Sequence, residues 1–503
     1  MKKHAERYVV IAMVLGIFMA SIDNTIVSAS INKVIEDIGG FENMSWVFTA
    51  YMLANTSTML VFGKLSDIYG RKLFFLIGVA LFLAGSALCG TAQDINQLII
   101  YRVIQGIGAG ALLPISFTII FSIFDDPKKA AKMTGIFAAV FGLSSVLGPQ
   151  LGTWISDAWN WRWCFYINVP LGIVSFVMLL VTLKESKSTK KPKIDFLGTF
   201  FLIATVITMM LVFEWGGKKY AWDSQEIILM SIGSLIGLII FLFIEKKASE
   251  PVLPLSIFKN KMVAGTTFIV FCQGVLMFSA ITYLPIFAVG VLGRAGSNGL
   301  LTPMMLSLMA GASLGGMFIS KLKFRTFYLI SMVMSVVSSI LLYNVNQDTD
   351  YYKVILIMIV LGLGAIGPLM SVSQNAVANS ISKDMLGTVN SLVAFFRNIG
   401  GILGASIMAT IVNNSLKTDL EKNLSQAHIP QDKISEMANP DVLLHASTNI
   451  PEQVLTIMRE ALAKAINHGF IFALVVCSLG IIVSLFVGSK KFEFQKPKEE
   501  AVK

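Results

Sequence analysis

Apolar runs long enough to cross a bilayer recur along the whole chain, and they constrain its fold more than any other feature. A helix that crosses the hydrocarbon core needs about 20 apolar residues. None of the runs shows the ten-residue alternation of a membrane β-barrel. We therefore predict an all-α polytopic membrane protein with fourteen transmembrane helices. The runs lie near residues 8–29, 45–62, 73–92, 98–121, 132–155, 164–183, 195–213, 225–244, 263–289, 298–320, 327–344, 351–378, 387–413 and 466–488.

Charged residues are scarce for a chain of 503 residues, which supports the same class. Only 14% of the residues are charged, against about 25% in an average soluble domain, and the mean hydropathy is +0.73. The net charge of +10 would suggest a nucleic-acid partner if the protein were soluble. In a membrane protein this excess is typical of basic cytoplasmic loops, so we expect no nucleic-acid partner.

The distribution of Lys and Arg predicts the orientation in the membrane. With the N-terminus inside, the inner segments hold 27 of the 40 Lys and Arg residues and the outer segments hold 11. The remaining two, Arg102 and Arg397, lie within apolar runs. This bias predicts a multi-pass protein, surrounded by membrane lipid, with both termini in the cytoplasm. The first apolar run continues too far for a cleaved signal peptide.

The runs form two blocks of six with shared features, which suggests an internal repeat. The fifth run of each block is rich in glycine, and a basic loop follows the second run of each. Transporters with two six-span halves show such symmetry, although chance could also place the glycines in this way. We predict an N-terminal six-helix bundle at 1–183, a cytoplasmic linker with two inserted helices at 184–262, a C-terminal six-helix bundle at 263–488 with a partly helical outer loop at 414–465, and a cytoplasmic tail at 489–503.

Two opposite charges lie at matching depth within the first block. Asp23 is about six residues from the outer end of the first run, roughly 9 Å deep, and Arg102 is about four residues into the fourth run, roughly 6 Å deep. Charges inside a bilayer are costly and usually mark a pathway. The pair could be a static structural ion pair. We favour a proton site at Asp23 that is tuned by the distance to Arg102, because apolar residues could replace a purely structural pair at little cost.

Two further charged residues each allow two interpretations. Arg397 lies about ten residues into the thirteenth run, and no acid in the second block matches it. It either lines a cavity or donates hydrogen bonds to backbone carbonyls. Glu214 stands at the outer mouth of the seventh run beside Trp215. It is either an interfacial acid in an aromatic belt or a second proton site.

Glycine and proline in two segments indicate where helices approach or move against one another. A tight segment joins the second and third runs, where Asp67 can cap the next helix or pair with a basic residue when the inner face is closed. The fifth run contains a glycine–proline group that gives a thin, kinked helix. The predicted gating residues are Gly63, Asp67, Gly70, Arg71, Gly148, Pro149 and Gly152.

These segments together resemble the fourteen-span drug:proton antiporters of the major facilitator superfamily, the group of the EmrB-like and quaternary-ammonium exporters. The segment at 63–72 is similar to the superfamily's tight-loop motif, with Ile68 where a basic residue is frequent. The segments at 102–110 and 148–152 resemble its fourth-span and antiporter motifs, with Thr153 in place of a second glycine. The segments at 23–27 and 161–172 resemble the first-span and sixth-span signatures of the fourteen-span group.

The resemblance implies a major facilitator fold of two six-helix bundles plus two inserted helices, located in the bacterial cytoplasmic membrane. It implies a monomeric, proton-coupled exporter of small lipophilic or cationic drugs that works by alternating access. The Asp23–Arg102 pair would couple the proton, and the proton gradient, without a cofactor, would supply the energy. A dedicated exporter of one antibiotic, lipid or metabolite is the alternative within transport.

Adaptable side chains are expected to line a substrate cavity. A receptor or enzyme is the alternative outside transport, but the sequence offers no nucleophile with a base, no nucleotide motif and no metal-ligand set. The four cysteines have no metal or redox spacing and suit small buried positions. The candidate cavity residues are Met19, Trp46, Tyr51, Gln105, Phe271, Gln273, Met277, Tyr283 and Arg397.

Overall fold

Short polar side chains set the first turn of many helices. Asp94 accepts a hydrogen bond from the backbone N–H of Gln97, and Asp195 does the same for Gly198. Such caps satisfy backbone N–H groups that the helix leaves without partners. The computed structural model describes residues 3–124, 126–185, 194–217, 219–294, 298–426 and 452–488.

Helices make up nearly all of the described chain, and the predicted all-α polytopic class is confirmed. Within the described residues, thirteen helical segments are long and apolar enough to cross a membrane. The remaining predicted span, near 45–62, lies in helix α2, which has 26 residues and is not among the thirteen. Its centre carries the polar segment 55–58, which lowers its hydropathy, and the helix packs between α4, α8 and α15.

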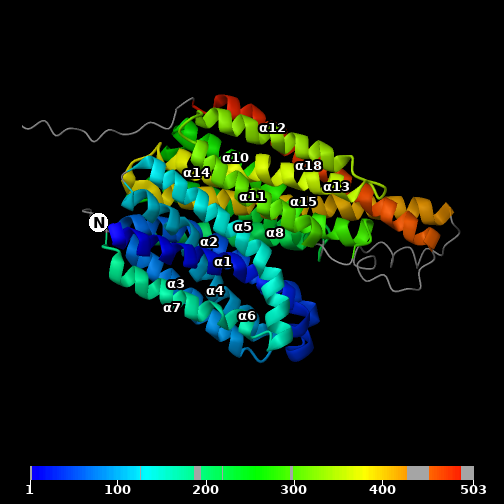
Figure 1. Cartoon of the computed structure of the whole chain (residues 1–503), viewed down its shortest axis with the longest axis horizontal. Helices are drawn as coiled ribbons and strands as arrows, with labels where there is room; N and C mark the ends of the chain where they lie inside the picture. Colours follow the sequence, from blue (N-terminus) through cyan, green and yellow to red (C-terminus); the bar gives the residue numbers. More distant parts are fainter. Residues whose placement is uncertain are drawn as a thin grey trace, which may run out of the picture.

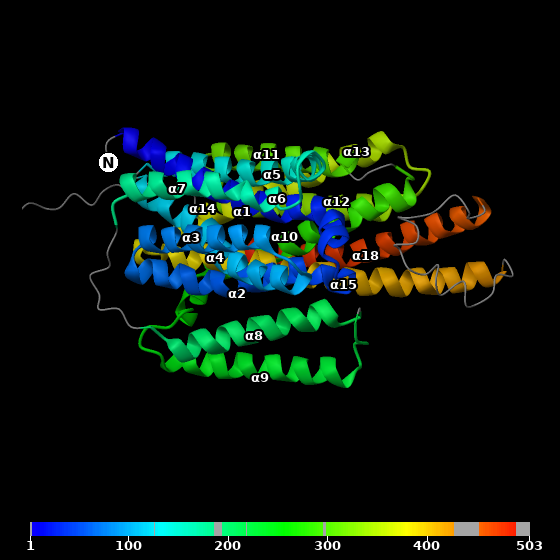
Figure 2. The same cartoon turned by 90° about the horizontal axis from the view of Figure 1, so that it is seen from below.

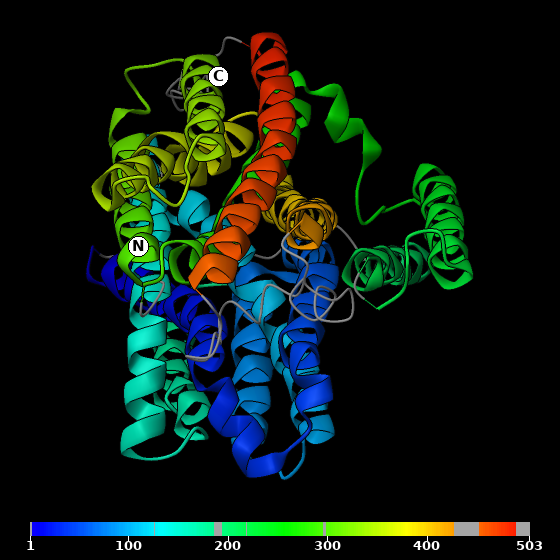
Figure 3. The same cartoon turned by 90° about the vertical axis from the view of Figure 1, so that its right-hand side faces the viewer.

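The helices before residue 183 gather in one group (Figures 1 and 3). They are α1 (Lys3–Ile38), α2 (Met44–Tyr69), α3 (Arg71–Thr91), α4 (Ile95–Ile123), α5 (Pro127–Ala158), α6 (Trp163–Tyr166) and α7 (Asn168–Thr182). The short helix α6 continues into α7, so the two together make one candidate span.

The helices after residue 260 form a second group beside the first. A π-helical turn, η3 (Phe287–Val291), ends the α10 span, and a second, η4 (Leu361–Ile366), joins α13 to α14. The α-helices are α10 (Lys261–Ile286), α11 (Asn298–Phe318), α12 (Phe324–Tyr343), α13 (Tyr351–Val360), α14 (Gly367–Ala378), α15 (Leu386–Gln426) and α18 (Glu452–Phe486).

The helices α8 (Phe196–Trp215) and α9 (Gln225–Lys247) lie to one side of both groups (Figures 2 and 3). Helix α8 packs against α2 and α15, whereas α9 packs mainly against α8. An apolar face exposed along a whole helix is what a lipid-facing helix requires. The exposed apolar side chains of α9 are Ile228, Leu229, Ile232, Leu235, Ile236, Leu238, Ile239 and Phe243.

Helices α15 and α18 continue well past the membrane-length segment, so both ends of the predicted partly helical loop at 414–465 are helical. Residues 414–426 continue α15 and residues 452–465 belong to α18, so the two helices project together in Figure 2. The physical reason is an apolar seam. Leu416 and Leu420 on α15 are buried in one cluster with Met458 and Leu462 on α18. The segments 186–193, 427–451 and 489–503, where we predicted the basic linker, the middle of the loop and the tail, lie outside the described residues.

The start of α1 and the end of α18 lie at the same end of the molecule in Figure 1, and we call this end the terminal face. The exposed residue Lys323 lies in a turn at the terminal face, and the exposed residue Asp348 lies in a turn at the other end. We expect a cysteine at Asp348, in intact cells, to react with a membrane-impermeant maleimide, whereas a cysteine at Lys323 reacts only after permeabilisation. All four native cysteines are buried, so labelling reports the new thiol. The reverse pattern would invert the predicted topology.

Candidate functional site

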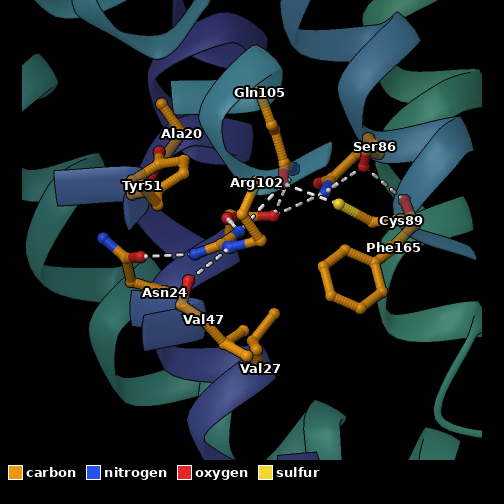
Figure 4. A network of polar contacts seen from close by, with 12 residues as sticks. Ala20, Asn24, Val27, Val47, Tyr51, Ser86, Cys89, Arg102, Gln105 and Phe165 are labelled. Atoms are coloured by element: carbon orange, nitrogen blue, oxygen red, sulfur yellow. Dashed lines mark hydrogen bonds and ion pairs between the residues drawn. The ribbon is translucent and has the colours of Figure 1, made fainter. Parts of the chain in front are cut away.

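Asp23 on α1 and Arg102 on α4 form a salt bridge, and both side chains are fully buried. The sequence-predicted pair therefore meets in space. Figure 4 shows Arg102 with Asn24, Val47, Tyr51 and Gln105 around it. Arg102 uses the rest of its guanidinium as well. Its Nη1 donates to Oε1 of Gln105 at 2.8 Å, its Nη2 to Oδ1 of Asn24 at 3.0 Å, and its Nε to the Val47 carbonyl at 3.1 Å. The buried cation thus uses four of its five N–H donors on protein acceptors, as the cost of burying a charge requires.

The carboxylate of Asp23 is equally well surrounded. Its Oδ1 accepts from Nε2 of Gln105 at 2.7 Å and from Nδ2 of Asn168 at 3.2 Å. Asn168 also donates to Oγ of Ser86 at 3.1 Å, which ties α7 and α3 to the pair. Five helices therefore contribute to the network around the ion pair, because the Val47 carbonyl on α2 also accepts a hydrogen bond from Arg102.

An aromatic ring closes the network on the α2 side. The guanidinium carbon of Arg102 lies 4.1 Å from the ring centroid of Tyr51, a cation–π distance. Helix α4 can come this close because Gly106 has no side chain. A Cβ there would lie 2.5 Å from the Tyr51 carbonyl oxygen. Gly106, in the glycine-rich sequence after Arg102, therefore allows α4 to pack closely against α2 next to the cation.

A cavity of about 530 Å³ lies between the two groups of helices, next to this network. Asn24 connects the two, because it lines the cavity and accepts the hydrogen bond from Arg102. Asp23 itself is not on the cavity wall. The walls come from α1, α2, α4, α5, α10, α11 and α15. The residues that line the cavity are Ala20, Ser21, Asn24, Thr25, Ser28, Ala29, Met52, Asn55, Met59, Ala109, Leu113, Phe141, Ser145, Val146, Pro149, Met277, Phe278, Ile281, Pro285, Leu301, Thr302, Met305, Arg397 and Asn398.

The cavity contains two of the nine predicted cavity residues, Met277 and Arg397, and the other seven positions are corrected by the structure. Tyr51 and Gln105 belong to the ion-pair network, and Gln273 bonds Arg397 instead of facing the cavity. Trp46 packs edge-on against Trp215. The remaining three, which pack in apolar clusters between helices, are Met19, Phe271 and Tyr283.

At the terminal face, Asp67 joins the two groups of helices. Its carboxylate accepts from the backbone N–H groups of Gly387 and Thr388, both at 2.8 Å, and from the Thr388 hydroxyl at 3.0 Å. It therefore caps α15, a helix of the second group. One of the two sequence interpretations expected it to cap the following helix, α3, and this is not observed. Arg71 lies 3.9 Å away and donates to the Lys383 carbonyl at 2.6 Å. A carboxylate at a helix N-terminus is stabilised by the helix dipole.

The cap of α3 comes from another residue, Glu185. Its carboxylate accepts from the backbone N–H groups of Lys72 and Leu73 at 3.2 and 3.0 Å. Gly70 makes this approach possible, because a Cβ at Gly70 would lie 2.2 Å from Oε1 of Glu185. Gly70 also has φ +116, a value that side chains rarely tolerate. At Gly63, a Cβ would lie 2.0 Å from Oγ of Ser391 across the interface.

The predicted glycines of α5 pack against α1 beside the ion pair. A Cβ at Gly148 would lie 1.9 Å from Oγ1 of Thr25, and a Cβ at Gly152 would lie 2.5 Å from the Ile26 carbonyl oxygen. Pro149 between them lines the cavity. The antiporter-like segment therefore contacts α1 within a few residues of Asp23.

Several polar contacts between the two groups lie on the terminal side of the cavity. Besides Asp67, Asn390 donates to Thr118 at 3.1 Å and Asn375 donates to Thr134 at 2.7 Å. The cavity instead reaches Pro285 near the end of α10 and Leu301 near the start of α11, both far from the terminal face. The structure is thus closed at the terminal face.

The sequence profile of the Major Facilitator Superfamily matches residues 13–405. The chain belongs to the major facilitator superfamily. Multidrug resistance protein 3 of Bacillus subtilis is 39% identical, over 97% of this chain and 96% of that protein. The multidrug transporter protein MdtP of the same organism is 33% identical, over 100% of this chain and 97% of that protein.

Two solved structures support the major facilitator fold. The human organic anion transporter MFSD10 gives a TM-score of 0.61 at 12% identity, covering 94% of this chain and 99% of that one. A bacterial homologue of the human lysosomal transporter Spinster gives a TM-score of 0.56 at 16% identity, covering 97% and 98%. At such identities the likeness concerns the fold alone.

Glu214, the possible second proton site of this major facilitator protein, lies away from both the cavity and the Asp23–Arg102 pair. Glu214 lies at the C-terminal end of α8, outside the cavity wall and outside the network of Asp23. No group of three or more His, Cys, Asp or Glu residues in the described ranges could hold a metal ion. Sequence reasoning missed Asn24, Ser86 and Asn168. Their signal is an amide or hydroxyl within or beside an apolar run, which is weaker than that of a charge.

Proposed function

We propose that this protein is a secondary active multidrug efflux transporter. It exchanges protons for lipophilic drugs, cationic ones among them, across the cell membrane by alternating access. The observation that carries the proposal is the position of the buried Asp23–Arg102 pair, one residue away from a drug-sized cavity through Asn24. Cavities of roughly 300–1,000 Å³ are typical of sites for small molecules.

The relatives support drugs as the transported compounds. Two proteins that match nearly the whole chain are called multidrug transporters or multidrug resistance proteins. Many side chains on the cavity wall are apolar and flexible, such as Met52, Met59 and Met305, and they can adapt to ligands of different shape.

The network supports proton coupling through a change in its geometry. While Arg102 contacts Asp23, the cation and the hydrogen bonds from Gln105 and Asn168 stabilise the negative charge of the carboxylate. Separation of α1 from α4 would leave Asp23 buried without its counter-charge, and it would then take up a proton. Drug bound against Asn24 changes the same hydrogen-bond set, so proton and drug act on one equilibrium.

The energy source can be tested in cells loaded with a fluorescent lipophilic dye. One charge that moves through 100 mV releases about 2.3 kcal/mol, enough for roughly a fifty-fold concentration gradient. We expect a protonophore to abolish dye efflux while the ATP concentration is held constant. Cells without the gene give the background rate. Efflux that continues with the gradient collapsed would rule out proton antiport.

A further inference from the structure

Arg397 is a buried cation on the cavity wall that pairs with no acid in the described chain. Its side chain is 4% exposed. Its Nε donates to Oε1 of Gln273 at 3.3 Å, but its Nη2 has no hydrogen-bond acceptor among the described residues. It forms no salt bridge with any described residue. Arg102, at comparable burial, has a carboxylate and three further acceptors.

The described wall of the cavity supplies no negative charge to Arg397. Arg397 is the one ionisable side chain among the residues that line the cavity, and none of them is Asp or Glu. An arginine keeps its proton in proteins, so the site cannot become neutral by releasing it. A buried cation without a counter-ion is strongly unfavourable, and the bound ligand is the remaining source of an anion.

The surroundings hold the guanidinium in place for such a ligand. Gln273 is fixed because its Nε2 donates to the Ile366 carbonyl at 2.8 Å, so its Oε1 stays directed at Arg397. Asn398 and Asn55 also line the cavity, and Oδ1 of Asn55 is buried without a hydrogen-bond partner in the described chain. Apolar walls next to the cation, such as Phe278, can receive a lipophilic body.

We propose that Arg397 binds an anionic group, a carboxylate or sulfonate, of an amphiphilic substrate, with Gln273 as its positioning residue. The inference rests on the proposed function and narrows its substrate class. A guanidinium binds a carboxylate through two parallel hydrogen bonds, which favours acids and zwitterions over drugs that carry only a positive charge. Cationic drugs then bind well where they also carry an acidic group.

The test compares two ligands that differ in one charge, dansyl-phenylalanine and its methyl ester, on the purified full-length protein in lipid nanodiscs. We expect the acid to bind the natural protein at least tenfold more tightly than the ester. Arg397→Gln should reduce this ratio to about one, and Arg397→Lys should retain part of it. Equal binding of acid and ester by the natural protein would overturn the proposal.

Two controls address a structural role of Arg397 and a small inorganic anion as the occupant. The melting temperature of Arg397→Gln should not fall, because no ion pair is lost, whereas that of Arg102→Gln should fall. A lower melting temperature for Arg397→Gln would indicate a structural role and overturn the proposal. Measurements at several sodium chloride concentrations test the inorganic anion. Chloride-dependent stabilisation without any acid preference would also overturn the proposal. Drug efflux from cells that express the natural protein tests the proposed function separately. Efflux can be present without a preference for the acid, and a preference for the acid can be present without efflux.

Discussion

Asp23→Asn is expected to abolish drug accumulation driven by a pH gradient in membrane vesicles, while drug exchange without a gradient continues. Asparagine keeps the size of the side chain but cannot take up or release a proton. Without this step, downhill proton movement cannot be linked to uphill drug movement. Loss of the charge also leaves Arg102 buried without its counter-ion, which costs on the order of 3–5 kcal/mol of stability. Drug exchange and drug binding are therefore measured on the same preparation.

Asp37 provides a matched control on the same helix. It also pairs with an arginine, Arg162, but near the C-terminal end of α1 where the carboxylate is about half exposed. Asp37→Asn makes the same chemical change outside the buried network, and we expect coupled accumulation close to that of the natural protein. Gradient-driven accumulation by Asp23→Asn vesicles would place the proton site at another residue.

Asp67→Asn is expected to slow drug efflux by roughly tenfold without loss of the protein from the membrane. The carboxylate accepts three hydrogen bonds from the first turn of α15, and charge-assisted bonds of this kind contribute about 1.5–3 kcal/mol. Since about 1.4 kcal/mol changes an equilibrium tenfold, the closed form of the terminal face should lose most of its advantage. The reporter is a cysteine at Leu386, which is buried in the closed structure and should become several-fold more reactive.

Glu185→Gln is the matched control for the terminal face. Glu185 also caps a helix with its carboxylate, but it does so within the first group of helices and so crosses no interface. We expect the reactivity of the Leu386 cysteine to stay unchanged in this variant. An equal effect of both substitutions would mean that cap loss in general, and not the link between the two groups, controls turnover.

The sequence was most informative where burial conflicts with chemistry. Asp23 and Arg102 could be paired from depth alone, because a charge in a bilayer needs a partner and few are available. The cavity wall was mostly missed for the opposite reason. In a soluble protein the polar face of a helix shows which side is outside, but here lipid and protein interior are both apolar. Tyr283 and Met277 on α10 therefore have similar sequence surroundings, yet only Met277 lines the cavity.

The extent of the helices beyond the membrane was predicted only as a partly helical loop. Hydropathy detects the part of α15 that crosses the membrane but not residues 414–422, whose exposed side is charged and whose apolar side is covered by α18. The hydrogen bonds from α15 to Asp67 could not be predicted from the sequence either. A carboxylate can cap any nearby helix, and only the folded arrangement brings residues 67 and 387 together.

The continuity of α15 has a mechanical meaning. One helix begins at the Asp67 cap, carries Arg397 at the cavity and ends in the projecting pair with α18. When its first turn is released, the whole rod must tilt, or it must bend where Gly400 and Gly401 follow Arg397. If it tilts, its far tip swings through the largest arc of any part of the helix. An antibody fragment that binds and fixes this tip would then hinder opening of the Asp67 contact at the other end of the protein.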